Sequence, residues 1–380
     1  MELILNEEQQ LLQDTAREFV NKNSSLRRVR TLRDSGDPLG YSRTLWGEMA
    51  KLGWLGIIFP EEYGGAGLGY TELMVILEEL GRGLLPEPFI SNILLAGNAI
   101  AIGGSPAQRQ AVLPSLISGD LLLALAHQES RSRYNPHDVE TQAQKTSSGW
   151  RLSGEKVHVL DGFGADRVLV SARTSGATAD RAGMTLFLLD VHAPGLSIER
   201  QWRIDSRNAA IVRLDDVAAA GDDVLGKVDH GSDILDTVID RATIGLCAEM
   251  LGGMNAALSM TLDYLKTRVQ FGVPIGSFQA LKHRAAKMYI ETELARSAVM
   301  AAHKTIDEDS QRVPALASIA KARCSDAFVL ISNEAVQMHG GIGMTDEHDI
   351  GFFIKRARVA EMTFGTAAYH RNRFAELQGY

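Results

Sequence analysis

The sequence is poor in cysteine, with only Cys247 and Cys324 among its 380 residues. Both lie in alanine-rich segments of helical character, so we expect buried free thiols rather than a disulfide framework, and a reducing compartment fits. The sequence also lacks any run of about 18 apolar residues, so neither a membrane-spanning helix nor a membrane partner is expected. Residues 1–8 contain no basic segment followed by an apolar one, so no leader is expected. These absences predict a cytoplasmic protein.

Basic residues are outnumbered: the chain has 39 Lys and Arg, 47 Asp and Glu, and a net charge of −8, without a basic block. This balance argues against nucleic acid as the main partner, and local cations would have to meet any anionic ligand. A chain of this length with 45% hydrophobic residues can bury a large core over two or three domains. It has no internal repeat and no low-complexity stretch, and no metal site is expected.

The chain begins with a helical region. Asn6 and Gln9 have the spacing of a capping box, and apolar residues then recur at helical intervals. Further helices are expected over residues 43–52, 71–81 and 108–119. After residue 121 the pattern alternates with period two, which is typical of strands. The clearest strands are expected over residues 150–160, 167–172 and 184–189, in a compact antiparallel barrel or sandwich.

From residue 233 onward the period is again that of helices. Three long helices are expected over residues 233–271, 277–305 and 312–339. Long antiparallel helices with short connections favour a four-helix-type bundle. The predicted fold class is therefore α+β, in the order helical, β, helical.

A corner between the first two of these helices gathers polar and aromatic residues. Gly272 and Pro274 should end the first helix, and the second starts at Ser277. Arg268 would then project from the last helical turn with Phe271 beside it, while Gln279 opens the next helix. The same pattern would also fit an ordinary helix hairpin.

A second unusual helix end follows Gln337. Gly340, Gly341 and Gly343 stand together at the end of the predicted third helix. A plain helix C-cap needs only one glycine, whereas several glycines allow a ligand to approach the backbone closely. Both readings remain open from the residues alone.

These segments resemble the acyl-CoA dehydrogenases. The resemblance rests on Arg268-x-Gln270-Phe271-Gly272 followed by Phe278-Gln279, on the Pro-Glu-Glu-Tyr-Gly-Gly of residues 60–65, and on the overall order of elements. It implies an N-terminal α-helical domain (1–120), a middle β domain (121–226) and a C-terminal helical bundle (227–380), with FAD as cofactor. It also implies that the corner and the glycine turn hold the FAD of a neighbouring subunit. The residues placed there are Arg268, Gln270, Phe271, Gln279, Gln337, Gly340, Gly341 and, near the C-terminus, Thr366.

In the β region the resemblance implies two strands against the flavin ring. The residues expected there are Leu125, His127, Gln128, His158 and Leu160. His158 stands where the family usually has Trp, and Leu160 and Gln128 each where it usually has Thr. His158 can orient the flavin or the substrate, or be an exposed strand histidine. Arg133 and Tyr134 lie in a segment that the family uses for substrate. These departures resemble a narrower branch, that of the small subunit of bacterial pimeloyl-CoA dehydrogenase and its relatives.

The resemblance implies a carboxylate base that removes the α-proton of an acyl-CoA, with hydride transfer from the β-carbon to flavin N5 to give a 2-enoyl-CoA. Many members carry this base as Glu before Gly-Thr near the C-terminus, where this chain has Phe364. Other members carry it early in the long helix, just before an Arg. Asp240 is therefore the candidate base and Arg241 an expected active-site cation, although a solvated surface pair would show the same sequence. Glu361 and Glu249 are weaker candidates.

Three functions are compatible with this sequence. The preferred one is an FAD-dependent acyl-CoA dehydrogenase that passes electrons to an electron-transfer flavoprotein or a similar acceptor. The alternatives are a catalytically silent subunit that shares its FAD site, and a flavin oxidase or monooxygenase on the same fold. Asp240 and Arg268 would lie about 42 Å apart on one helix at 1.5 Å per residue. They should thus serve two different flavins, which predicts a homotetramer or a heterotetramer with a related subunit.

Overall fold

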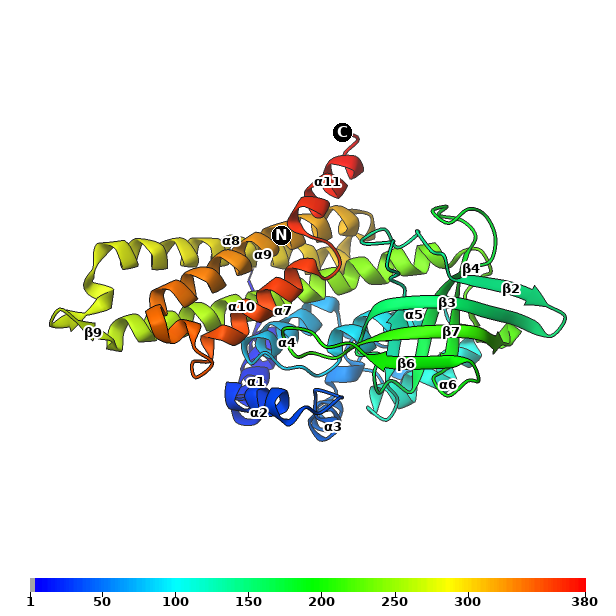
Figure 1. Ribbon diagram of the computed structural model, residues 1–380, viewed down its shortest axis with the longest axis horizontal. Helices are drawn as coiled ribbons and strands as arrows, with labels where there is room; N and C mark the ends of the chain where they lie inside the picture. Colours follow the sequence, from blue (N-terminus) through cyan, green and yellow to red (C-terminus); the bar gives the residue numbers. More distant parts are fainter. Residues whose placement is uncertain (1–3) are drawn as a thin grey trace. The chain divides into compact units, whose positions relative to one another are not determined.

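The computed structural model describes residues 4–380. Residues 1–3 belong to the N-terminal segment in which no leader is expected, and they lie outside the described residues. The chain divides into two compact units (Figure 1). A helical unit contains the described residues up to 31, together with 69–85 and 243–380, and a sheet unit contains 32–68 and 86–242. No helix between residues 4 and 380 is long and apolar enough to cross a membrane.

The sheet unit contains eight strands. Their bounds are β1 Leu123–Ala126, β2 Gln142–Thr146, β3 Gly149–Leu160, β4 Arg167–Arg173, β5 Met184–Asp190, β6 Leu196–Arg200, β7 Ala209–Ala219 and β8 Val224–Leu225. The strand order is β6-β7-β3-β2-β4-β5-β8, and β1 pairs with β4. The expectation of a purely antiparallel sheet is wrong, because β1 runs parallel to β4 and β2 meets β4 in one parallel pairing. Period-two alternation shows which face is buried but not the strand direction.

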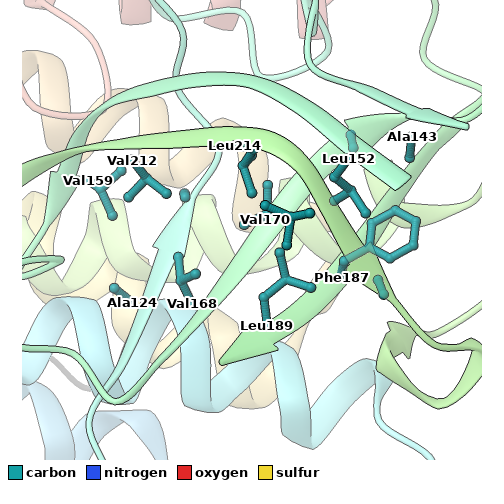
Figure 2. Close-up of a cluster of buried hydrophobic side chains, with 14 of the residues drawn as sticks. Ala124, Ala143, Leu152, Val159, Val168, Val170, Phe187, Leu189, Val212 and Leu214 are labelled. Atoms are coloured by element: carbon teal, nitrogen blue, oxygen red, sulfur yellow. The ribbon is translucent and has the colours of Figure 1, made fainter. Parts of the chain in front are cut away.

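The core of this unit lies within the sheet. Figure 2 shows apolar side chains from β1, β2, β3, β4, β5 and β7 gathered in one cluster. Trp150 and Phe187 pack edge to face in it, with ring centroids 5.7 Å apart. Helices complete the unit: α3 Arg43–Lys51, a buried π-helix at Phe89–Gly97, α5 Asn98–Gly103 and α6 Pro106–Ile117. The π-helix was not expected, since an apolar run of this length does not distinguish helix from buried strand.

The helical unit holds the long helices predicted from the sequence. It contains α1 Glu7–Asn23, α4 Tyr70–Arg82, α8 Gln279–Glu308, α9 Val313–His339, α10 Ile350–Met362 and α11 Ala367–Leu377. Helices α2 Leu26–Ser35 and α7 Gly231–Thr267 each begin in one unit and end in the other. The capping box is confirmed, because the Asn6 side chain accepts from the backbone N–H of Gln9 and the Gln9 side chain from that of Asn6.

Two glycines allow α4 and α7 to pack closely. A Cβ atom at Gly252 would lie 1.8 Å from the carbonyl oxygen of Glu78, and one at Gly81 would lie 2.1 Å from that of Glu249. Neither distance is possible for a real side chain. Any larger residue at either position would therefore push the two helix backbones apart.

The corner after α7 differs from its prediction. The helix ends at Thr267 rather than near 271, and Val269–Gln270 pairs with Val273–Pro274 in a two-stranded hairpin. Phe271 and Gly272 form the turn with φ angles of 54° and 78°. Positive φ at both central residues is the requirement of a type I′ turn, which a two-residue hairpin favours. Arg268 thus lies just past the helix end, while Gln279 opens α8 as predicted.

Candidate functional site

Two of the strand segments expected to face a flavin meet in the sheet unit. The backbone N–H of Val157 donates to the carbonyl oxygen of Gln128 over 2.8 Å. The pairing of β3 with β7 shifts register between Lys156 and Val159, and His158 within this irregularity has a φ of 53°. Bulges and left-handed non-glycine residues cost free energy and concentrate at functional sites. The structure therefore brings the segment of Gln128 next to the segment of His158, at the point where the pairing of β3 is irregular.

A buried ion pair lies beside this junction. Lys156 is fully buried, and its Nζ lies 2.6 Å from Oε1 of Glu129 and 3.0 Å from Oγ of Ser171. Burial alone would raise the pKa of Glu129, but Lys156 and hydrogen bonds from Thr141 and the Glu140 backbone hold it below its usual range. Burial lowers the pKa of Lys156 to about 8 in spite of Glu129. Both groups are thus charged at neutral pH and fix the two segments together.

His127 lies close to this pair. Burial and the charge of Lys156 lower the pKa of His127 to about 4, so its imidazole is neutral. Its Nδ1 is buried without a hydrogen-bond partner among residues 4–380. Leu125 packs its side chain in the core, so only its backbone can meet a ligand, and Leu160 is half-buried opposite Ala209.

The loop after β1 is internally bonded. The side-chain amide of Gln128 donates to the carbonyl oxygen of Arg133 over 2.8 Å, and Arg133 has a φ of 45°. Arg131 pairs with Glu140 at 2.7 Å. Arg133 and Tyr134, the two predicted substrate-binding residues, therefore lie in a loop that Gln128 holds in shape.

Asp240 and Arg241 lie in the part of α7 that belongs to the sheet unit. Asp240 is only 3% exposed, unlike a member of a solvated surface pair. Arg241 Nη1 donates to the side-chain oxygen of Asn98, which is buried at the start of α5, over 3.0 Å. The arrangement places an acid away from bulk water, and a buried amide orients the arginine that follows it in the chain.

The other carboxylates considered as bases have different surroundings. Glu249 is buried against Arg356, with 2.8 Å between its Oε1 and the guanidinium Nε. Glu361 pairs with Arg358 at 3.3 Å. Glu249 is thus committed to an ion pair inside the helical unit.

Phe364, which stands where many relatives carry the base, lies in a tightly held turn. Its φ is 60°, and its carbonyl oxygen accepts a hydrogen bond from Nε2 of His370 over 3.0 Å. The buried ammonium of Lys321 donates to the carbonyl oxygens of Glu361 and Gly365 over 2.9 and 2.6 Å. Thr366 caps α11 through the backbone N–H of Tyr369.

Sequence reasoning missed Lys321, although a lone lysine in the alanine-rich Ala-Lys-Ala segment of α9 was a usable signal.

The corner after α7 presents its side chains to solvent. Phe271 is 92% exposed and packs edge to face with Phe278, their ring centroids 6.1 Å apart. Arg268, Gln270 and Gln279 are exposed around this ring pair. The glycine turn is connected to this region, since the Tyr264 ring of α7 stacks on His339, which precedes Gly340, at 4.5 Å. A Cβ atom added at Gly340 or Gly341 would meet no atom within 4 Å.

Three family models together match most of the chain. They are the acyl-CoA dehydrogenase N-terminal domain over residues 6–120, the middle domain over 124–217 and the C-terminal domain over 229–378. The chain is 32% identical over 329 residues to acyl-CoA dehydrogenase FadE12 of Mycobacterium tuberculosis, covering 85% of this chain and 84% of that protein. The chain belongs to the acyl-CoA dehydrogenase family.

Solved structures agree with this assignment. Butyryl-CoA dehydrogenase from Megasphaera elsdenii superposes with a TM-score of 0.92 at 26% identity and covers all of both chains. The ChsE4–ChsE5 complex from Mycobacterium tuberculosis superposes with a TM-score of 0.90 at 27% identity and covers 100% of this chain and 99% of that one. The predicted fold, with helical, sheet and helical regions in this order, is confirmed.

The family implies FAD, and the residues present fit such a cofactor in two places. In the sheet unit, a bulged strand, the Gln128 carbonyl region and the unpartnered Nδ1 of His127 offer polar contacts beside buried apolar residues. In the helical unit, an exposed aromatic pair lies among a guanidinium and amides, which suits an adenine ring and a diphosphate. Each place by itself supplies only part of what a dinucleotide needs.

Proposed function

We propose that this chain is an FAD-dependent acyl-CoA dehydrogenase in which Asp240 removes the α-proton of the acyl thioester. The observation that carries the proposal is the burial of Asp240, which is 3% exposed in α7 and precedes an arginine anchored to Asn98. A general base for a carbon acid works best where water is excluded. Bound FAD would supply the two-electron acceptor for the β-hydrogen.

The neighbouring residues would orient the substrate for this proton transfer. Arg241 places a positive charge beside the base, and its bond to Asn98 limits its motion. Arg133 and Tyr134 would contact the substrate from the loop that Gln128 holds. His158 and the Gln128 backbone, joined through β3, would line the flavin side of the site.

The functional form is an oligomer. Exposed apolar side chains on one side of α8 favour pairing with another subunit; they are Tyr289, Ile290 and Leu294, each more than half exposed. A buried contact between subunits removes such side chains from water. The assembly would be a homotetramer or a heterotetramer with a related chain, and an electron-transfer flavoprotein or similar protein would accept the electrons.

Anaerobic reduction of the bound flavin tests this function. Purified protein reconstituted with FAD should lose its oxidised-flavin absorbance when mixed with a panel of short, long and ring-containing acyl-CoA thioesters. Reoxidation should be fast with an electron-transfer flavoprotein and slow with oxygen. A flavin that no thioester reduces, even after coexpression with a related subunit, favours the silent-subunit alternative. Rapid reoxidation by oxygen favours an oxidase.

A further inference from the structure

Three aromatic side chains stack beside the glycine turn of the helical unit. Tyr264 of α7 and His339 at the end of α9 have ring centroids 4.5 Å apart with a 30° angle between their planes. His339 and His348, from the loop before α10, lie 4.4 Å apart, and Tyr264 meets His348 edge-on at 6.3 Å. Each ring therefore contacts both others.

This stack connects the two segments expected to hold the FAD of a neighbouring subunit. Tyr264 lies one helical turn before Arg268, whose backbone N–H donates to the Tyr264 carbonyl over 2.8 Å. His339 directly precedes Gly340 in the chain. The ring contacts therefore link the helix end before the corner to the helix end before the glycine turn.

The surroundings of the His339 imidazole favour its neutral form. His339 is 2% exposed, its Nδ1–H donates to the carbonyl oxygen of Ala335 over 2.7 Å, and its Nε2 is buried without a partner among residues 4–380. His348 Nδ1 accepts the backbone N–H of Ile350 over 3.2 Å, which needs its lone pair. Protonation of His339 at Nε2 would bury an unpaired charged N–H.

The charges around the stack do not favour an imidazolium at His339. Burial lowers the pKa of His339 from its usual 6.5, and His348 lowers it further, while the bond to Ala335 acts in the opposite direction. His348 is flanked by Asp346 and Asp349, and both carboxylates pair with Arg30 of α2, at 3.0 and 2.7 Å. The third side of the stack is the ring of Tyr264, and Glu347 beside His348 is exposed to solvent.

We propose that Tyr264, His339 and His348 form a positioning stack that holds the Arg268 corner and the Gly340–Gly341 turn in the arrangement that binds FAD, and that it does so only while the His339 imidazole is neutral. The inference rests on the proposed function. Above about pH 6.5 the His339 ring is neutral in the closed and the opened stack, so pH has no effect there. Below it the opened stack takes up the proton first, so acid favours opening. FAD binding should therefore weaken as the pH falls below 6.5.

Titration of FAD binding against pH tests the stack without any catalytic readout. The FAD dissociation constant of the wild type should be flat between about pH 8 and 7 and rise by up to roughly tenfold per pH unit below 6.5. The variant His339→Phe keeps a stacked ring that cannot be protonated, so its dissociation constant should stay low across the range. The variant His339→Ala should bind FAD weakly at every pH.

His339→Gln is a second variant in case His339→Phe does not fold. Its side-chain amide can donate a hydrogen bond but cannot titrate, so it should reduce the acid-dependent loss of FAD. Circular dichroism at about pH 8 checks folding of each variant. Tight binding with the same pH slope in all folded variants would overturn the stack while leaving the proposed function intact. A wild type that binds no FAD at any pH would overturn both.

Discussion

At the scale of single residues, the proposed chemistry depends on Asp240. It occupies a buried position on α7, and aspartate is one methylene shorter than the glutamate that relatives use. Asp240→Asn preserves size and should leave FAD bound, because the proposed role of Asp240 is proton transfer rather than cofactor binding. The rate of flavin reduction by an acyl-CoA in stopped-flow measurements should fall by about 10²-fold or more, the usual cost of removing a general base.

Glu361→Gln provides the matched control for this change. Glu361 pairs with Arg358 at the end of α10, and its loss should leave the reduction rate within a factor of a few of wild type. Undiminished reduction in Asp240→Asn, combined with a large loss in Glu361→Gln, would move the base to the C-terminal segment.

Arg268 is the residue on which FAD retention should depend most directly. It is exposed just beyond α7, where a charged hydrogen bond to phosphate is available only once a dinucleotide binds. Arg268→Ala should raise the FAD dissociation constant by roughly tenfold or more, since a hydrogen bond to a charged group contributes about 1.5–3 kcal/mol. Lys266→Ala, two residues earlier, removes a cation paired only loosely with Asp263 and should have little effect. Equal losses in both variants would point to general electrostatics instead.

Candidate functional residues could be predicted from the sequence where they stand in a local motif. Asp240 with Arg241, and Arg268 with Phe271, stand at recognisable spacings. Lys156 stands in no such pattern, and the alanine-rich surroundings of Lys321 indicate a buried lysine without indicating its partners. Their partners lie 27 and up to 44 residues away in the sequence, and only the tertiary fold buries them together.

At the scale of elements, the turn between α10 and α11 depends on one buried cation. Lys321 holds the carbonyl oxygens of Glu361 and Gly365, and burial lowers its pKa from 10.5 to about 8. Between about pH 8 and 10.5 the unfolded chain binds this proton more strongly than the folded chain does. Lys321 therefore adds a term to the free energy of unfolding that rises with pH, by up to about 1.4 kcal/mol per pH unit.

Urea unfolding of the wild type and Lys321→Met across this pH range measures that term. The variant should be less stable at about pH 7, because two buried carbonyl groups lose their donor at a cost of about 1–3 kcal/mol each. The difference in the free energy of unfolding between wild type and variant should then increase as the pH rises from about 8, because only the wild type has this proton to lose. A difference that decreases as the pH rises would show that the ammonium stabilises the fold through its charge.

Element types followed from periodicity, whereas directions and ends did not. The long α7, α8 and α9 were predictable because their apolar positions recur over many turns. The parallel pairing of β1 with β4 is fixed by connections between strands, which alternation does not encode. The hairpin at the end of α7 depends on a left-handed backbone at Phe271, a residue type that gives no signal for a type I′ turn.

At the scale of the whole molecule, the proposed site is incomplete in one chain. Helix α7 is continuous from Gly231 to Thr267, so the 27 residues between Asp240 and its C-terminal end correspond to about 40 Å of helix. A single flavin cannot contact both ends of such a helix. Each FAD would then meet Asp240 from one subunit and Arg268 from another.

Subunit complementation decides whether sites are shared in this way. Chains carrying Asp240→Asn and chains carrying Arg268→Ala, each with a different affinity tag, are coexpressed, and the mixed oligomers are purified through both tags. In a mixed pair with shared sites, one site combines an intact Asp240 with an intact Arg268, and the other carries both substitutions. Since a two-fold axis makes the two sites equivalent, mixed pairs should recover about half of the wild-type rate of flavin reduction at limiting FAD. The separate variants under the same conditions should show the low rates of their single defects.

Native mass spectrometry identifies the species that carries the recovered activity. Mixed oligomers no more active than the average of the two parents would mean that each chain completes its own site, and an FAD-loaded active monomer would exclude sharing altogether.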